Sequence, residues 1–298
     1  MKPRFGHFCA VAALTMVAAA GLAAAGPIAL THVHGLAYSA DGTELLIPSH
    51  HGLAVYRAGG WSKAPGPEHD YMGFSATRDR FYSSGHPAPG SGLTNPLGLI
   101  RSDDGGKTWS KLGLEGESDF HLLATGYESN AVFVYSTHPN SRMRKPGLYY
   151  TVNDGFGWHE VRANGLSGKI AALAVHPADP KTLAVASSTG IYLSRDSGDT
   201  FKPLKSGAQA VSVFFDLDGR HLWGGSYEGR GTLVRIDLAS GRAAPVPVPE
   251  LPEDAVAYVA QNPKRRSEYA IATFERSVFL SRDGGKSWTP IAERGRAR

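Results

Sequence analysis

Histidines recur at two strand-end positions in three successive segments of the first half of this 298-residue chain. The inner position, near the start of an apolar segment, is occupied by His34, Met72 and His121. The outer position, at the end of the segment that follows, is occupied by His51, His86 and His138. Neutral imidazole is the commonest protein ligand for transition metals, and a thioether beside imidazoles favours copper. We therefore predict a copper or zinc site that draws on these six residues.

Carboxylates accompany the same positions. Asp70 and Asp119 stand two residues before the inner position of the second and third segments. They could support metal-bound histidines, or they could act as catalytic groups of a glycosidase, which needs two carboxylates about 5 to 10 Å apart. Glu228 and Glu275 lie near the corresponding strand ends of later segments. These four carboxylates are the candidate catalytic residues, and the sequence does not give their separation.

An internal repeat sets the elements that must position these side chains. The pattern Ser/Thr-x-Asp/Asn-x-Gly-x-x-Trp/Phe occurs four times, at 102–109, 151–158, 194–201 and 281–288. Each copy follows a β-rich run, which is typical of a turn between two strands. The Asp or Asn can accept backbone N–H groups within the turn, and Gly supplies a positive φ. The closing aromatic can then pack between neighbouring repeats.

The spacing of the copies predicts the number of repeats. Successive copies start 49, 43 and 87 residues apart, and the last interval holds a degenerate copy at 234–241. A second degenerate copy, at 54–61, precedes the first intact one. Repeats of this length with four strands are typical of propeller blades. We predict an all-β fold, a single β-propeller of six four-stranded antiparallel blades; a seventh is possible if the two ends form a split blade. The six units begin near residues 32, 71, 120, 170, 211 and 256.

The first 25 residues predict export. Lys2 and Arg4 precede an apolar stretch at 8–20 and three alanines at 23–25, the order found in a secretory signal peptide. The apolar stretch is short for a transmembrane helix. We therefore expect a periplasmic or secreted mature chain without a membrane span, in which residues 26–298 form the propeller.

Removal of this leader also limits the metal sites and the partners that the mature chain can have. It takes away Cys9, the single cysteine, so neither a disulfide nor a thiolate metal site is expected. It also takes away two basic residues, which lowers the formal net charge from +4 to +2, and no basic stripe remains for a nucleic-acid partner. The basic segment at 294–298 is expected to be a solvated end. Two long connections, 86–96 and 138–147, should overhang the face that carries the histidines.

Through the four copies of its turn pattern, which is the Asp box, the chain resembles the BNR-repeat propellers. The segments His32-Val33-His34-Gly35-Leu36-Ala37 and Gly85-His86-Pro87-Ala88-Pro89-Gly90 are most similar to bacterial secreted BNR-repeat proteins classed as glycosylhydrolases. Sialidases, sortilin-type receptors and photosystem II assembly factor-like propellers are similar more distantly. The resemblance implies a central channel lined by the first strand of each blade. It also implies that the Asp boxes are structural and face away from the site.

Three functions are compatible with these observations. A metal-binding or metal-handling propeller leads, because the histidine pattern is the most specific feature outside the repeats. A glycoside hydrolase acting on a carbohydrate follows from the resemblance alone, and this chain lacks the Arg-Ile-Pro motif that sialidases carry early in the sequence. A scaffold that binds a protein partner is the third. Since related folds host both enzymes and binding proteins, the sequence leaves open whether this chain is an enzyme.

Overall fold

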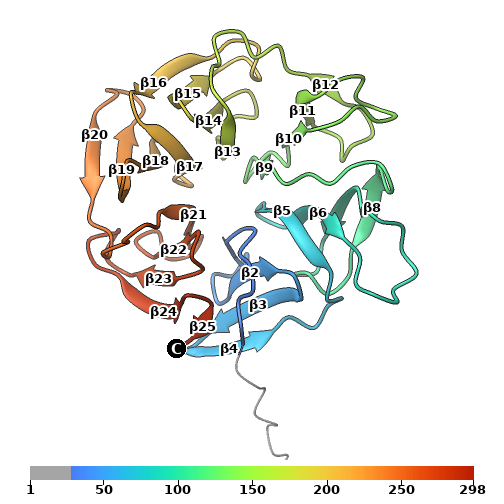
Figure 1. Ribbon diagram of the computed structural model, residues 1–298, viewed down its shortest axis with the longest axis horizontal. Helices are drawn as coiled ribbons and strands as arrows, with labels where there is room; N and C mark the ends of the chain where they lie inside the picture. Colours follow the sequence, from blue (N-terminus) through green and yellow to red (C-terminus); the bar gives the residue numbers. More distant parts are fainter. Residues whose placement is uncertain (1–27) are drawn as a thin grey trace, which may run out of the picture.

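The computed structural model describes residues 28–298, so the predicted leader at 1–25 lies outside the described residues. Six antiparallel sheets form a closed ring, with the first strand of each sheet nearest the axis and the last strands at the rim (Figure 1). Within these residues there is no helix long and apolar enough to cross a membrane. The predicted all-β propeller with six blades is confirmed.

Each of the first three blades has four strands in chain order. Blade 1 consists of β1 (Ala37–Tyr38), β2 (Leu45–Ser49), β3 (Gly52–Arg57) and β4 (Gly60–Lys63). Blade 2 consists of β5 (Asp70–Ala76), β6 (Phe81–His86), β7 (Leu99–Ser102) and β8 (Ser110–Gly113). Blade 3 consists of β9 (Leu123–Thr125), β10 (Val132–Ser136), β11 (Gly147–Thr151) and β12 (His159–Glu160).

The other three blades follow the same plan, with one extra strand at the end of the chain. Blade 4 consists of β13 (Ile170–Val175), β14 (Leu183–Ser187), β15 (Gly190–Ser194) and β16 (Lys202–Ser206). Blade 5 consists of β17 (Gln209–Phe215), β18 (His221–Tyr227), β19 (Gly231–Asp237) and β20 (Ala243–Val246). Blade 6 consists of β21 (Val256–Gln261), β22 (Tyr269–Thr273), β23 (Val278–Ser281), β24 (Thr289–Glu293) and β25 (Arg296–Ala297).

The hydrophobic core is divided among the boundaries between blades. Because side chains alternate along a strand, each sheet offers an apolar face to both of its neighbours. The cluster between blades 1 and 2 combines Leu46 and Val55 of the first with Tyr71 and Ile100 of the second. Five further clusters join the remaining pairs of blades, including blades 6 and 1. The ring is therefore closed by the same kind of packing that joins its other blades.

The aromatic residue that closes each turn pattern lies in these inter-blade clusters. The four members of this set are Trp109, Trp158, Phe201 and Trp288. Trp61, from the degenerate copy in blade 1, occupies the same place between blades 1 and 6 and donates from Nε1 to the carbonyl of Ile291 at 3.0 Å. Phe201 is fully buried, whereas the tryptophans keep a partly exposed edge. The predicted inter-blade position is confirmed.

Hydrogen bonds within the first intact turn show why its residue types are needed. Ser102 Oγ accepts the backbone N–H of Gly106 at 2.8 Å, and Asp104 accepts the backbone N–H of Thr108 at 2.9 Å. Gly106 has a φ of 89°, and a β-carbon there would collide with Leu53 of the preceding blade. The turn therefore joins β7 to β8 and packs closely against the preceding blade at the same time.

The two ends of the described chain meet at the boundary between blades 6 and 1. The backbone N–H of Leu30 donates to the carbonyl of Gly295 at 2.8 Å, and Ala29 forms a β-bridge with Arg296. Strand β25 pairs in turn with β24. The arginines of this basic end, Arg294, Arg296 and Arg298, are exposed as expected, whereas its backbone completes the junction between the two blades.

Candidate functional site

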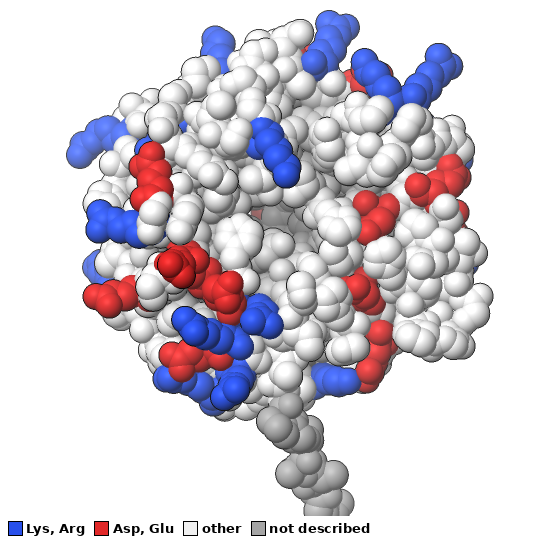
Figure 2. All heavy atoms as spheres, viewed as in Figure 1, with Lys and Arg blue, Asp and Glu red and all other residues white. Residues whose placement is uncertain are grey.

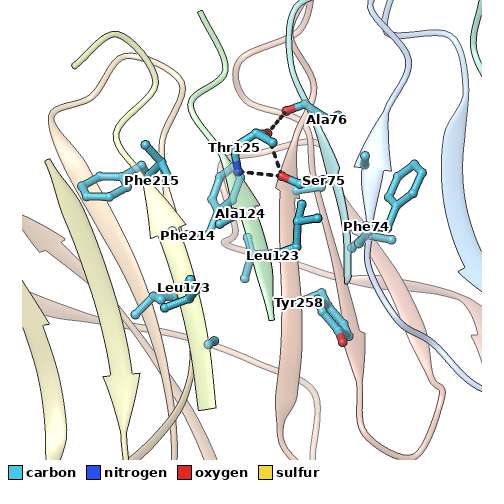
Figure 3. Close-up of a pocket in the computed structure, with 18 of the residues that line it drawn as sticks. Phe74, Ser75, Ala76, Leu123, Ala124, Thr125, Leu173, Phe214, Phe215 and Tyr258 are labelled. Atoms are coloured by element: carbon cyan, nitrogen blue, oxygen red, sulfur yellow. Dashed lines mark hydrogen bonds between the residues drawn. The ribbon is translucent and has the colours of Figure 1, made fainter. Parts of the chain in front are cut away.

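A channel of about 200 Å³ runs along the axis of the ring and is lined by residues of all six blades. Most of the residues that line it are apolar in type. The hydroxyls of two polar wall residues, Ser75 and Thr125, share a hydrogen bond of 2.8 Å (Figure 3). His34 and His121 contribute to the lining just before the first strands of blades 1 and 3. His34 and His121 therefore stand together at one mouth of the channel.

The surface around the hollow centre of the ring carries charges of both signs. On the face shown in Figure 2, Lys and Arg side chains are interspersed with Asp and Glu and are spread mainly around the rim. Recognition of a nucleic acid needs a continuous basic patch or stripe. The face shown carries no such patch.

Three histidines of blade 1 lie together where β1 begins and β2 ends. The ring centroids of His32 and His50 are 4.2 Å apart, and those of His34 and His50 are 5.1 Å apart. His32 and His34 are stacked, with their centroids 5.5 Å apart. One ligand atom from each of the three lies within 4.8 Å of the other two. These are the nitrogen donors that a transition metal uses.

Asp70, the first residue of β5 in blade 2, reaches into this group. Its Oδ2 lies 2.7 Å from Nδ1 of His50, and its Oδ1 lies 3.9 Å from Nε2 of His34. His34 Nε2 and Asp70 Oδ1 are both buried and lack a hydrogen-bond partner. Two such atoms facing one another mark a position for a water molecule or an ion. We call His32, His34, His50 and Asp70 the first histidine cluster.

Burial decides the charge state of His34 in the absence of a bound ion. Desolvation lowers the pKa of His34 to about 4; Asp70 opposes this effect, and the neighbouring His50 and His32 add to it. Burial penalises the charged form of an imidazole. His34 is therefore neutral at pH 7, which is the form that can bind a metal.

A second group repeats this construction one blade further along the chain. Asp119, which precedes β9, places its Oδ2 2.7 Å from Nε2 of His121 and 3.1 Å from Nε2 of His86. Asn95, in the long β6–β7 connection, holds the other nitrogen of His86, with Oδ1 2.7 Å from Nδ1. The hydrogen bond with Asp119 raises the pKa of His121. We call His86, His121 and Asp119 the second histidine cluster.

Two predicted histidines lie outside both clusters. His51 is exposed and lies near Glu68, whereas its neighbour His50 faces Asp70. The two residues occupy the tight β2–β3 turn and point to different sides, so that His50, and not the predicted His51, joins the other histidines of blade 1. His138 is exposed, with Nδ1 2.9 Å from the hydroxyl of Thr137. Among residues 28–298, no hydrogen bond, ion pair or ring contact joins His51 or His138 to either cluster.

The methionines are placed differently from the sequence prediction. Met72 is buried in β5 and is not one of the residues that line the channel; Gly73 takes that place. The pairing of β5 with β6 is irregular between Met72 and Ser75, and Gly73 adopts a positive φ of 51° there. Met143, from the second long connection, is fully buried in the core between blades 2 and 3. Neither position supports a thioether ligand at the mouth of the channel.

The structure separates the four carboxylate candidates into two kinds. Asp70 and Asp119 are partly buried and each contacts histidines of a cluster. Glu228 and Glu275 are exposed and follow β18 and β22 in blades 5 and 6. Only the two aspartates therefore belong to the histidine face as parts of a connected site.

Sequence reasoning missed His32 and His50. A signal existed for His32, because side chains two residues apart along an extended segment lie on one side, and His34 was already a candidate. The pair His50-His51 offered two neighbours, of which one had to face the site. No sequence rule for a two-residue turn tells which of them faces a neighbouring blade.

Another group of potential ligands lies between blades 5 and 6. Asp216, Asp218 and His221 offer atoms within 4.8 Å of one another. Asp216 is fully buried, and its carboxylate accepts hydrogen bonds from Arg235 and from Trp223 Nε1 at 2.7 Å. Since Arg235 already compensates the charge of Asp216, this group is structural.

Comparison with known protein families gives a match over part of the chain. The family model described as Sortilin-Vps10 (Sortilin, neurotensin receptor 3) matches residues 98–222, less than half of the chain. Comparison with curated protein sequences finds no match. The similarity to sortilin-type propellers expected from the Asp boxes is thus found over the middle of the chain.

Solved structures resemble the whole ring at low sequence identity. A GH74 enzyme of Niastella koreensis is 16% identical with a TM-score of 0.60, covering 89% of this chain and 46% of that one. YCF48 bound to a D1 peptide is 17% identical with a TM-score of 0.50, covering 89% of this chain and 84% of that one. The extracellular domain of the one-component system BT4673 from B. thetaiotaomicron is 13% identical with a TM-score of 0.54, covering 91% and 34%. This chain therefore spans less than half the length of two of these proteins, and the likeness is one of fold.

Proposed function

We propose that this protein binds a divalent transition metal, zinc or copper(II), through His32, His34 and His50. The observation that carries the proposal is the grouping of these imidazoles, with ligand atoms within 4.8 Å of one another, around the unpartnered Nε2 of His34. Zinc–nitrogen bonds of about 2.1 Å in a tetrahedral site hold ligand atoms roughly 3.4 Å apart. Side-chain rotations that move the nitrogens by about 1 Å would bring the three nitrogens to that separation.

Asp70 would act on the metal through His50. A neutral His50 that donates its Nδ1 proton to Asp70 presents the lone pair of Nε2 to the metal, and the contact of 2.7 Å fixes the orientation of the ring. Imidazole nitrogens suit both zinc and copper(II). Because Met72 does not line the channel, the argument for copper from a thioether beside the imidazoles loses its basis, and copper and zinc both stay open.

Binding measurements with a matched pair of variants test this proposal. The protein is produced without a polyhistidine tag, stripped with a chelator and titrated with zinc and copper(II) by calorimetry. We expect His50→Ala to weaken binding by at least about tenfold, since it removes one ligand of three. His51→Ala, one residue away and exposed, should bind as the unaltered protein does. Absence of binding, or an equal loss in both variants, would refute the assignment.

A second candidate function is the binding of a polypeptide at the same face. It is favoured by the comparison with YCF48, because the likeness extends over 84% of a protein whose structure contains a bound peptide. The long β6–β7 connection beside the histidine face could contribute to such a surface. A glycoside hydrolase is less well supported, since Asp70 and Asp119, the inner carboxylates, are both engaged with histidines.

We also propose that the protein acts in the periplasm or outside the cell. The support is the order of basic, apolar and small residues at 1–25 and the absence of cysteine from residues 26–298. The intact mass of the exported protein tests this proposal. A mass that retains residues 1–25 would contradict it.

A further inference from the structure

The long connection between β6 and β7, residues 87–98, is attached near its start by a buried histidine. His69 lies directly before β5, and the backbone N–H of Ala88 donates to its Nδ1 at 2.9 Å. Residues 89–95 of the connection are exposed. We propose that His69 is a pH-sensitive switch, whose neutral imidazole holds this connection and whose protonation releases it. The proposal is separate from metal binding, because it involves none of the three proposed ligands.

The hydrogen bond with Ala88 defines the protonation state in which the connection is held. Because the donor is a backbone amide, Nδ1 of His69 must be the acceptor, and the proton of the neutral ring is on Nε2. A protonated imidazole donates from both nitrogens and accepts from neither. Two N–H groups would then face one another across 2.9 Å. Only the neutral form of His69 can therefore hold the connection.

Burial gives this contact its direction of response to pH. It lowers the pKa of His69 below the ordinary value of 6.5, since the charged form of the ring is poorly solvated there. Detachment of the connection would admit solvent and return the pKa toward about 6.5. The attached form therefore binds protons less readily than the detached form. It is favoured fully above about pH 6.5, and this advantage is lost progressively as pH falls below that value.

The carboxylates beside His69 in the chain do not compensate a charge on its ring. Glu68 is paired with Lys63 at 2.7 Å, and Asp70 is paired with His50 at 2.7 Å. Burial is the sole cause of the lowered pKa of His69, so within residues 28–298 no charged side chain offsets it. Protonation would thus place an uncompensated charge in a buried position, which is costly.

The strands packed against His69 also offer it neutral groups. On β5, the ring of Tyr71 lies 5.7 Å from that of His69, and its hydroxyl donates to a backbone carbonyl at 3.0 Å. On β3, Gly52 donates its backbone N–H to the carbonyl of His69 at 3.0 Å. His51, which precedes Gly52, is exposed and lies near Glu68. Detachment of the connection is therefore the way in which a charged His69 gains solvation.

The far end of the connection is held by contacts that acid does not break. Nδ1 of His86 lies 2.7 Å from Oδ1 of Asn95, and its Nε2 lies 3.1 Å from Oδ2 of Asp119. Both partners can accept, so a protonated His86 would donate to each of them. The backbone N–H of Leu97 also donates to the carbonyl of Gly85 at 2.8 Å. Acid should accordingly free the start of the connection while its end stays attached.

Hydrogen exchange at the amide of Ala88 tests the switch directly. Exchange in the metal-free protein is followed by NMR between about pH 7 and pH 4, and each rate is divided by the intrinsic rate of an unprotected amide at that pH. We expect the protection of the Ala88 amide to fall at least about tenfold, because loss of a buried hydrogen bond shifts local opening by that order. The amide of Leu97 should keep its protection over the same range.

Two replacements of His69 form a matched pair. His69→Asn places an acceptor oxygen near the position of Nδ1 but does not titrate, so the Ala88 amide should stay protected at every pH. His69→Phe keeps a flat ring but offers no acceptor, so this amide should exchange freely at every pH while that of Leu97 does not change.

Two results would overturn the proposal. One is constant protection of Ala88 in the unaltered protein over the whole pH range. The other is a loss of protection in His69→Asn equal to that of the unaltered protein, because another group would then be responsible. If a variant does not fold, as judged by its thermal melt, the comparison of Ala88 with Leu97 in the unaltered protein decides.

Discussion

Oδ2 of Asp70 and Nδ1 of His50 lie 2.7 Å apart although the two residues belong to different blades. Asp70 begins the first strand of blade 2, and His50 follows the second strand of blade 1. The orientation of the imidazole is therefore set by the packing of one blade against the next. A metal site built in this way depends on the core between the blades as well as on its own ligands.

Replacement of Asp70 tests the role of this contact. Asp70→Asn keeps the size of the side chain but removes the charge that holds His50 and offsets that of the bound ion. Loss of such a partner typically weakens metal binding about 10- to 100-fold, and we expect a change in this range for the ion proposed at the first histidine cluster. Calorimetric titration with zinc measures it. Asp41→Asn, which changes an exposed carboxylate between β1 and β2 of blade 1, should leave the affinity unchanged. Equal affinities of the unaltered protein and Asp70→Asn would argue against the role of Asp70.

Replacement of Trp109 tests how much the inter-blade aromatic residues contribute to the free energy of unfolding. It packs in the cluster between blades 1 and 2, with its ring 4.9 Å from that of Tyr71. We expect Trp109→Ala to lower the free energy of unfolding by about 3 kcal/mol, the low end for large aromatics because one edge is exposed. Urea unfolding measures this loss. Phe156→Ala, in another turn but with 81% of the residue exposed, should change the stability little. Similar losses in the two variants would contradict the inter-blade role.

Asp104 predicts a specific dependence of stability on pH. Hydrogen bonds from the backbone and hydroxyl of Thr108 lower the pKa of Asp104 to about 2. The unfolded value is about 3.9, so the carboxylate stabilises the fold fully above that pH, and the effect is lost as pH falls through about 2. The stability advantage of the protein over Asp104→Asn should therefore shrink between pH 4 and pH 2.

Unfolding by urea at a series of pH values measures this difference. Asn153 occupies the equivalent position in blade 3 and accepts a backbone N–H of the turn at 2.9 Å, so Asn is compatible with the turn. Asn153→Asp should accordingly gain the pH dependence that Asp104→Asn loses. A stability difference between protein and Asp104→Asn that stays constant from pH 7 to pH 2 would be inconsistent with the lowered pKa.

The number and boundaries of the blades could be predicted from the sequence because the repeat is visible in it. The turn pattern recurs at fixed intervals, and even the degenerate copy at 54–61 keeps Trp61 in the equivalent inter-blade position. Because the same unit occurs six times, the spacing of the other copies locates blade 5 even though the turn pattern is lost there.

The candidate site could be predicted only in part. Aligning the first strands correctly selected His34 and His121, which line the channel. The same alignment failed at Met72, because the neighbouring Gly73, at a positive φ that residue types do not reveal, lines the channel instead. It also chose His51 instead of His50, since the side to which a turn residue points depends on contacts with another blade. Rotation about the propeller axis predicts the positions of equivalent strands in different blades well. It predicts the positions of the residues at the strand ends poorly.

The hydrogen bond between Leu30 and Gly295 has a consequence for how the protein matures during synthesis. Gly295, which helps to seal blade 1 against blade 6, is synthesised 295 − 30 = 265 residues after Leu30. Until blade 6 has been made, blade 1 lacks one of its two packing partners, and its three clustered histidines are not held by a complete ring. The proposed capture of a metal by His32, His34 and His50 would therefore wait for blade 6, although these residues belong to the first blade. A circular permutant that joins residue 298 to residue 28 and opens between blades 4 and 5 would remove this delay while keeping every blade intact.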